Sequence, residues 1–389
     1  MLRLYSVLRR YRPVFSGEAI HWESMFSALI ERGVRPVVLS QGQGNLPEKE
    51  IVKDVMVRRF WGIGSGMRCE FTWTYELCKY LVATRHDFDV LLLHSCGVFS
   101  FLLLLVAKIL GKGTVLRMTL LDSDDPVTVS QRKMGGVQNL AFRLADRVVS
   151  LSTPLTSRYR QVFGNTRKIR LIPQGVNTAR FYPVSPQNKL VLRRKLGLSE
   201  GDEFICFVGS IIARKGVDIL VDAFLHLADQ LPELNLLLVG PLDGSEPGHH
   251  AFVQDLQSRI RHAGLTTRVR FLGKVENVPE YLQASDLFVF PSAREGLPSA
   301  LVEAMAVGLP CIVSHIEGIT EDLISQGENG IIVYSARYDD YAKYIQQLFS
   351  HPDDATVMGR QARTTVEQGY SVEIIAAKNL SVFREVLVR

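Results

Sequence analysis

The feature that most constrains this 389-residue chain is a regular alternation of short apolar runs with longer segments of helical periodicity. Such alternation is typical of strand–helix–strand units, which build parallel sheets covered by helices on both faces. Because it occurs in both halves of the chain, the sequence predicts an α/β protein with two doubly wound domains. Strands are expected at 36–40, 90–94, 114–117, 148–152, 169–172, 203–208, 235–239, 269–272, 287–291, 311–314 and 330–334.

A segment rich in turn-forming residues separates the two halves. Residues 173–183 begin and end with proline and contain Gly175, a composition that suits an interdomain connection. We therefore place the boundary near residue 183, with an amino-terminal domain over 1–183 and a carboxyl-terminal domain over 184–370. Residues 371–389 form a predicted helix with an apolar stripe, and one interpretation packs it back on the first domain.

Several features argue against export or membrane insertion. The longest apolar run, residues 98–110, includes Lys108 and is too short to span a bilayer, so it predicts a buried helix. Arginines near the amino terminus interrupt the continuous apolar stretch that a signal peptide would need. Five scattered cysteines without CxxC spacing indicate reduced thiols rather than disulfides or a zinc site. We therefore expect a cytoplasmic protein without a structural metal.

Charge is distributed unevenly along the chain. Residues 1–190 contain 27 Lys and Arg against 14 Asp and Glu, whereas residues 191–389 contain 18 against 26. A basic half attracts phosphate-bearing ligands, anionic membranes or acidic polymers, and its charge does not choose among them. Because no nucleic-acid-binding signature accompanies this charge, nucleic acid is not expected as a partner.

The densest functional signal is a turn and a helix start late in the chain. Glu295 and Gly296 form the turn, and Pro298 suits the first turn of the helix that follows. Glycine lets the backbone approach a ligand, and the amides at the helix start, near Ser299, favour an anion such as phosphate. Glu303, about one turn further on, would accept hydrogen bonds from sugar or ribose hydroxyls. Without further signals, the alternative interpretation is that Glu295 is an acid at the start of a helix and Glu303 is a solvated surface charge.

A second signal follows the strand expected at 203–208. Arg214 and Lys215 come just after this strand, and parallel sheets bind ligands beyond the carboxyl ends of their strands. The two cations could neutralise a diphosphate, the lysine as a point charge and the arginine as a fork. A capped, solvated loop is the alternative interpretation. A third loop, residues 14–18, contains Gly17 and could touch the same anion from the other domain.

Together these segments resemble the family-four retaining glycosyltransferases of GT-B architecture, over nearly the whole length of the chain. Glu295 and Glu303 match the two acids of the EX7E motif of that family. The remaining matches are residues 145–152, 172–177, Gly209, Lys215, Gly216, Gly240, residues 271–273 and residues 285–292. The resemblance implies two Rossmann-like domains that face each other across a cleft, with neither metal nor organic cofactor.

The resemblance also implies a division of labour, with a nucleotide-sugar donor on the second domain and the acceptor on the first. Lys215 would hold the diphosphate, Glu295 the transferring sugar and Glu303 the ribose. His94 matches a histidine that this family often has, and a structural histidine is the alternative. The expected catalytic residues are Glu295, Lys215 and His94. The expected donor contacts are Gly17, Gly209, Ser210, Arg214, Lys215, Gly273, Val275, Glu295, Gly296, Leu297, Pro298, Ser299 and Glu303.

The chain departs from the pattern of the family at two places. Ser210 stands where an arginine usually follows the glycine, and two interpretations stay open: Arg214 supplies the second cation, or the diphosphate is held more weakly. The histidine commonly found after the strand at 114–117 is absent. Asp122, Asp124 and Asp125 follow instead, as acceptor contacts or as a turn cluster before a proline. Asp122 and Asp124 also imitate a DXD metal motif, which we discount because the resemblance is to metal-independent enzymes.

The function expected from the resemblance is transfer of a sugar from a UDP or GDP donor to a hydroxyl of a glycan or lipid-linked acceptor. The setting would be cell-surface polysaccharide or glycolipid synthesis. The basic half favours an anionic or membrane-borne acceptor, reached by peripheral contact with the inner face of an anionic membrane. Two alternatives stay open: an epimerase or phosphorylase-like enzyme of the same fold, and a non-catalytic nucleotide-sugar-binding scaffold. The sequence does not specify base, sugar, acceptor, linkage or oligomeric state.

Overall fold

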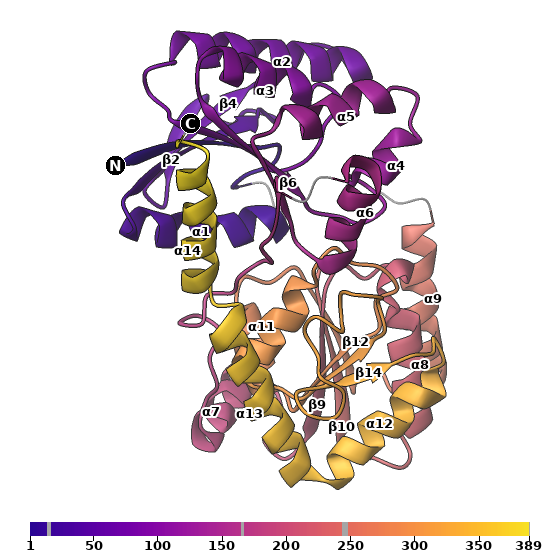
Figure 1. Ribbon diagram of the computed structural model, residues 1–389. Helices are drawn as coiled ribbons and strands as arrows, with labels where there is room; N and C mark the ends of the chain where they lie inside the picture. Colours follow the sequence, from indigo (N-terminus) through magenta and orange to yellow (C-terminus); the bar gives the residue numbers. More distant parts are fainter. Residues whose placement is uncertain (14–16, 165–166, 243–247, 389) are drawn as a thin grey trace. The chain divides into compact units, whose positions relative to one another are not determined.

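The computed structural model describes residues 1–13, 17–164, 167–242 and 248–388, and it divides into two compact units (Figure 1). Unit 1 comprises Met1–Gly175 together with Val372–Arg389, and unit 2 comprises Val176–Ser371. The division falls before the boundary expected near residue 183, because Val176 already pairs with Ser371 in a parallel bridge of unit 2.

Unit 1 is built on an eight-stranded sheet with the order β3-β4-β2-β1-β5-β6-β7-β8. Neighbouring strands are parallel, except that β3 and β4 are antiparallel. The five strands predicted in this part of the chain are all present. The strands are β1 (Leu2–Leu8), β2 (Val34–Gln41), β3 (Lys49–Val52), β4 (Val55–Phe60), β5 (Val90–Leu93), β6 (Gly113–Met118), β7 (Arg147–Ser150) and β8 (Ile169–Leu171).

Three strands of this sheet, β1, β3 and β4, were not predicted. β1 lies inside the sheet although Arg3 interrupts its apolar run, because the Asp89 carboxylate accepts hydrogen bonds from Arg3 Nε and from its backbone amide. β3 and β4 form a hairpin whose two turn residues, Lys53 and Asp54, have φ of 46° and 65°. Asn-Gly usually signals a turn with two positive φ angles, so the Lys-Asp sequence hid this hairpin.

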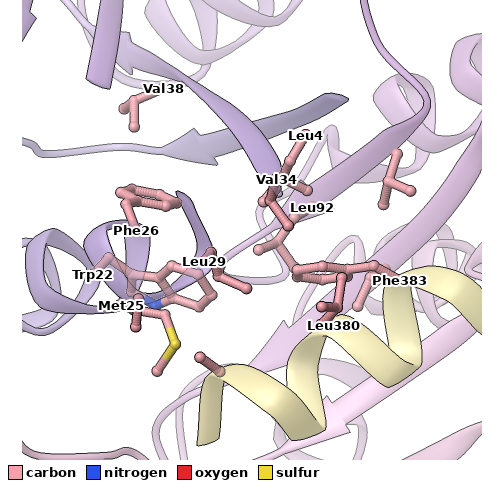
Figure 2. Packing of buried hydrophobic residues seen from close by; sticks show 14 of the residues in the cluster. Leu4, Trp22, Met25, Phe26, Leu29, Val34, Val38, Leu92, Leu380 and Phe383 are labelled. Atoms are coloured by element: carbon pink, nitrogen blue, oxygen red, sulfur yellow. The ribbon is translucent and has the colours of Figure 1, made fainter. Parts of the chain in front are cut away.

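Two helix layers cover the sheet of unit 1 (Figure 1). One contains α1 (Gly17–Glu31) and α14 (Val372–Glu385), which pack side by side. The other contains α2 (Gly66–Ala83), α3 (Ser100–Ile109) and α5 (Gly135–Leu144), and α4 (Pro126–Ser130) and α6 (Thr153–Phe163) complete the helices of the unit. Figure 2 shows Leu380 and Phe383 of α14 in the same core as Trp22 and Phe26 of α1. The last helix of the chain is therefore part of the core of unit 1.

Helix α3 corrects one expectation, since the apolar run at 98–110 was predicted to form a buried helix. Leu103 and Leu104 are fully buried or nearly so, but Leu105 and Ile109 are 41% and 75% exposed. The helix packs between α2 and α5, and one of its sides faces β5 and β6 of the sheet. Among the described residues, no other helix of this layer covers the opposite side. Apolar composition alone did not distinguish these two sides.

Unit 2 contains a six-stranded, fully parallel sheet with the order β11-β10-β9-β12-β13-β14. All six strands predicted in the second half are present. They are β9 (Glu203–Val208), β10 (Leu234–Val239), β11 (Val269–Gly273), β12 (Leu287–Phe290), β13 (Cys311–Ser314) and β14 (Ile331–Val333). The chain builds outward in one direction from β9 and in the other from β12, so the strand order reverses between these two strands.

Helices pack on both faces of this sheet, as the doubly wound prediction requires. α8 packs with α9 and α12, whereas α11 packs with α10 and α13, and α7 packs with α10. Their bounds are α7 (Pro186–Lys195), α8 (Val217–Leu227), α9 (His249–His262), α10 (Val278–Ala284), α11 (Ser299–Val307), α12 (Tyr338–Ser350) and α13 (Pro352–Gly369), with a short 3-10 turn, η1, at Ala213–Lys215. Each unit is thus an α/β sheet domain of Rossmann type.

Within the described residues, every helix is too short or too polar to cross a membrane.

Candidate functional site

The first candidate site lies in unit 2, at the carboxyl ends of β9 and β12. These two strands are neighbours at the point where the strand order reverses. In open parallel sheets, loops diverge on either side of such a point and leave a crevice in which ligands bind. The loop after β9 carries Arg214 and Lys215, and the loop after β12 carries Glu295. The fold therefore brings together the two strongest signals of the sequence.

Gly216 allows these two loops to pack against each other. It has φ of 66°, and a Cβ atom added there would lie 2.1 Å from the carbonyl oxygen of Pro291, which directly follows β12. The backbone amide of Ala293 also donates to the carbonyl oxygen of Arg214 at 3.0 Å. Both loops are therefore held at a separation that places Lys215 beside Glu295.

Glu295 is the centre of the cluster. Its Oε1 accepts hydrogen bonds from Lys215 Nζ and from Ser292 Oγ, both at 2.5 Å, and lies 3.7 Å from Arg214 Nη1. The ammonium of Lys215 also lies 5.0 Å from the centre of the Phe290 ring. Since Glu295 is buried, its carboxylate is oriented by charge-assisted hydrogen bonds rather than by solvent. The two cations exceed this one carboxylate by one positive charge, which suits a bound diphosphate.

The helix that follows Glu295 begins where the sequence indicated. Gly296, Leu297 and Pro298 are buried, and α11 starts at Ser299. Pro298 precedes the helix rather than occupying its first turn, since its ψ of 92° is not helical. The amino-terminal end of α11 carries positive dipole charge and therefore adds to the cationic side of the site.

Glu303 lies one turn into α11 and is partly buried. Burial raises the pKa of its carboxyl group to about 7, and the nearby Arg180 opposes this rise. Arg180 also donates to the carbonyl oxygen of Glu276, three residues after the end of β11. Glu303 therefore lies on the β11 side of the site, the side on which Gly273 and Val275 are found.

The loop after β9 begins with Gly209 and Ser210. Both are partly buried, and the amide of Gly209 donates to the carbonyl oxygen of Val239 at the end of β10. Arg214 comes within 3.7 Å of the Glu295 carboxylate and donates to the carbonyl oxygen of Arg294. A second cation is thus present in this loop, four residues after the position where the family has an arginine.

Unit 1 has its own reversal of strand order, between β1 and β5, and His94 directly follows β5. His94 is buried, with Nε2 at 2.6 Å from Ser6 Oγ and Nδ1 at 3.4 Å from Glu18 Oε1. Burial lowers its pKa, and Glu18 opposes this effect. Gly17 is the exposed first residue of α1, and residues 14–16 of the predicted glycine loop lie outside the described residues.

Arg117 is a member of this cluster that the sequence analysis missed. It lies in β6 and is fully buried, with its guanidinium carbon 4.7 Å from the centre of the Trp22 ring. Among the described residues, its three guanidinium nitrogens have no hydrogen-bond partner. Burial lowers its pKa to about 10, and Glu18 and Asp124 oppose this effect. An arginine within a buried strand was the signal that could have found it.

The three aspartates considered for acceptor binding occupy turn positions. Asp125 Oδ1 accepts from the amides of Val127 and Thr128 and caps α4, and Asp124 accepts from the amides of Thr119 and Leu120. Asp122 has φ of 58° and contacts Arg158 at 3.1 Å. Asp125 is thus a helix cap and Asp124 an acceptor within the turn, and both are buried, so the turn-cluster interpretation accounts for both of them.

Two sequence families match the chain. Residues 15–180 match the description Glycosyltransferase Family 4, and residues 188–365 match the description Glycosyl transferases group 1. The two matches adjoin one another and together cover most of the chain.

Two curated relatives are bacterial enzymes, a mannosyltransferase and a synthase. The lipopolysaccharide core biosynthesis mannosyltransferase LpsB of Rhizobium meliloti is 31% identical over 229 residues, which span 58% of this chain and 61% of the relative. The N-acetyl-alpha-D-glucosaminyl L-malate synthase of Bacillus anthracis is 26% identical over 79% of this chain and 77% of the relative. The match to LpsB thus spans about three-fifths of the length of that relative.

Solved structures share the fold of the whole chain. Anabaena HepE, solved in complex with UDP and glucose, has a TM-score of 0.79 at 21% identity and covers 99% of this chain and 100% of its own. WaaG, a glycosyltransferase involved in lipopolysaccharide biosynthesis, has a TM-score of 0.75 at 17% identity over 98% of this chain and 99% of its own. At these identities the likeness establishes the fold.

Proposed function

This chain belongs to glycosyltransferase family 4, and from that premise we propose that it transfers a sugar from a UDP or GDP donor to a hydroxyl of a glycan or lipid-linked acceptor. The observation that carries the proposal is the Lys215–Glu295 pair at the reversal of strand order in unit 2. Relatives of this chain are described as a mannosyltransferase of lipopolysaccharide core synthesis and a galactosyltransferase acting on a lipid diphosphate.

In this proposal the donor lies along the carboxyl edge of the sheet of unit 2. The base is placed near Gly273 and Val275 after β11, and the ribose near Glu303. Lys215 and Arg214 neutralise the diphosphate together with the start of α11. Glu295 is then released from Lys215 and accepts hydrogen bonds from hydroxyls of the transferring sugar. The order of these groups follows the strand order β11, β10, β9, β12.

The chemistry requires charge stabilisation on the leaving group. The bond between the anomeric carbon and the diphosphate oxygen breaks, and the acceptor oxygen forms the new bond on the same face of the sugar. The acceptor proton passes to the leaving phosphate oxygen, which is why no separate base is assigned in unit 2. Preorganised cations aimed at the departing diphosphate stabilise the transition state more than the ground state.

We assign the acceptor to unit 1, which contains 28 Lys and Arg against 16 Asp and Glu. His94, held between Ser6 and Glu18, is the polar group proposed to contact the reacting sugar there. A unit with a net charge of +12 favours an acceptor that carries phosphate or lies on an anionic membrane.

The layer of α2, α3 and α5 supports the membrane version of this proposal. It carries many of the exposed large apolar side chains of the described residues, among them Phe71 and Tyr75 on α2, Leu105 and Ile109 on α3, and Leu140 on α5. Exposed apolar side chains next to basic ones are typical of proteins that rest on an anionic lipid surface. We propose that this face lies on such a membrane.

Nucleotide release from a panel of UDP and GDP sugars tests the transfer proposal. Lys215→Ala and Glu295→Gln should each lower release at least about 100-fold, since removal of one charge-stabilising group typically costs that much. The matched control is the Lys195–Glu280 pair, also at 2.5 Å, between α7 and α10 of the same unit. Lys195→Ala should leave release within about two-fold. Donor binding without release would favour the scaffold, and an epimerised or phosphorolysed donor would favour the alternative enzymes.

Liposome sedimentation tests the membrane face. The double variant Phe71→Ser/Ile109→Ser should bind vesicles with anionic lipid more weakly than the wild type. Binding of the wild type should also fall as the salt concentration rises. The control Tyr338→Ser/Val357→Ser removes similarly exposed apolar residues from unit 2 and should bind as the wild type does. Equal binding of all three proteins, or indifference to anionic lipid, would contradict this part of the proposal.

A further inference from the structure

One exposed aromatic pair lies at the same edge of the sheet of unit 2 and is not used by the proposed donor contacts. His315 and Tyr334 directly follow β13 and β14, with ring centres 4.7 Å apart and planes inclined by 27°. Tyr334 is 69% exposed, more than any other Phe, Tyr or Trp side chain among the described residues. One face of its ring therefore rests on His315 and the other is open to solvent.

The pair is held in place by hydrogen bonds. His315 Nε2 lies 2.9 Å from Glu321 Oε1, and the other oxygen of Glu321 accepts from the amide of Gly318 at 2.6 Å. The amide of His315 donates to the carbonyl oxygen of Val333, the residue before Tyr334. His315 is therefore fixed in place beneath the Tyr334 ring, which reduces the conformational freedom lost when a ligand stacks on that ring.

A continuous path connects this platform with Glu295. Ser314 Oγ donates to the carbonyl oxygen of Ser292, and Ser292 Oγ donates to Glu295 Oε1. β12, β13 and β14 are consecutive neighbours, and neighbouring strands lie about 4.8 Å apart. The platform is thus one to two strands beyond Glu295, on the side opposite to β11. A ligand whose base lies at β11 and whose sugar lies at Glu295 points toward it.

We propose that the open face of Tyr334, supported by His315, stacks on a pyranose ring of the acceptor glycan. This proposal rests on the proposed function. One face of a pyranose presents C–H groups with partial positive charge, which complement the negative face of an aromatic ring. The hydroxyls of the sugar remain at the rim, where the exposed position of Tyr334 leaves them hydrated.

Three substitutions separate stacking from packing. Tyr334→Leu keeps apolar volume but removes the aromatic face, whereas Tyr334→Phe keeps the face. Tyr338→Leu is the matched control, since Tyr338 is also exposed and contacts a histidine, His226, but lies on α12. With an active donor and acceptor, Tyr334→Leu should raise the acceptor KM about 3- to 10-fold at constant donor KM, the range given by aromatic stacking. Tyr334→Phe and Tyr338→Leu should match the wild type.

A binding measurement tests the platform without turnover. Saturation-transfer NMR with UDP present uses the methyl pyranosides of glucose, galactose, mannose and N-acetylglucosamine as probes. At least one should give a signal with the wild type, Tyr334→Phe and Tyr338→Leu, and none with Tyr334→Leu. Absence of signal from the wild type, or its survival in Tyr334→Leu, would overturn the platform. Absence of nucleotide release from every donor would overturn the proposed function instead, so the two failures are distinct.

Discussion

Substitution of Glu303 by glutamine should make unit 2 more stable at high pH, with a much smaller effect near pH 5. The pKa of Glu303 rises because burial disfavours its charged form. Below pH 4.5 the carboxyl group is protonated in both the native and the unfolded chain. Between pH 4.5 and about 7 only the native state holds the proton, so the free energy of unfolding falls as the pH rises. Glutamine carries no charge at any pH and escapes this loss.

The size of the effect follows from the same shift. The pKa rises from 4.5 to about 7, and each pKa unit corresponds to about 1.4 kcal/mol. The ionised carboxylate therefore costs the native state about 3 kcal/mol above pH 7. The control is Glu280→Gln in the same unit, because hydrogen bonds from Asn277 and Lys195 lower the pKa of Glu280. That substitution should lose stability above the ordinary glutamate pKa, with the opposite sign.

Urea denaturation at pH 5 and pH 8.5 measures this difference. All three tryptophans lie in unit 1, so fluorescence reports unit 1 while far-UV circular dichroism reports both units. The dichroism midpoint of Glu303→Gln should exceed that of the wild type at pH 8.5, with an unchanged fluorescence midpoint. Equal midpoints at both pH values, or a variant that is weaker at pH 8.5, would refute the reasoning from burial.

Three further predictions concern other parts of the structure. Gly216→Ala should lower the free energy of unfolding by about 1–3 kcal/mol in urea denaturation and slow nucleotide release, because Gly216 has a positive φ and closely approaches Pro291. The control is Gly264→Ala, which should leave release unchanged, because Gly264 has a similar φ of 71° but open space around it. Asp125→Ala should lower the stability of unit 1 by about 1 kcal/mol, because it removes the cap of α4. The fluorescence midpoint measures this loss, and an unchanged midpoint would exclude the cap as a stabilising contact. Burial, together with Arg117, lowers the pKa of His21 to about 3. Below pH 6.5 the unfolded chain therefore binds a proton at His21 that the native chain does not, and unit 1 loses stability on acidification. His21→Gln should make this loss less steep between pH 6.5 and pH 4, and an equally steep loss would contradict the prediction.

The sheet of unit 2 was predictable from sequence because its strands are continuous apolar runs. Buried parallel strands need no alternation, and all six runs stand between clear helical segments. In unit 1 the same rule missed β1, where Arg3 is neutralised by a residue 86 positions away, and the β3–β4 hairpin. Both depend on partners or turn angles that local periodicity does not contain.

The candidate site was predictable in part for a similar reason. Lys215 and Glu295 each follow a recognisable strand, and the reversal of strand order makes them neighbours. The hydrogen bond from Ser292 to Glu295, and the path from Ser292 through Ser314 toward His315, depend on loop packing that spacing does not give. Arg117 was missed although an arginine in an apolar strand is visible in the sequence, because only the structure shows that its guanidinium lies buried on the Trp22 ring.

The return of α14 to unit 1 sets the order in which the chain can fold during its synthesis. Ile375, Leu380 and Phe383 belong to the core of unit 1, yet they are made after the whole of unit 2. Unit 2 is one continuous segment and can complete its sheet as soon as it leaves the ribosome. The first 175 residues must meanwhile hold an unfinished apolar face, the kind of surface that chaperones bind. A nascent chain arrested before Val372 would thus carry a finished unit 2 and an unfinished unit 1.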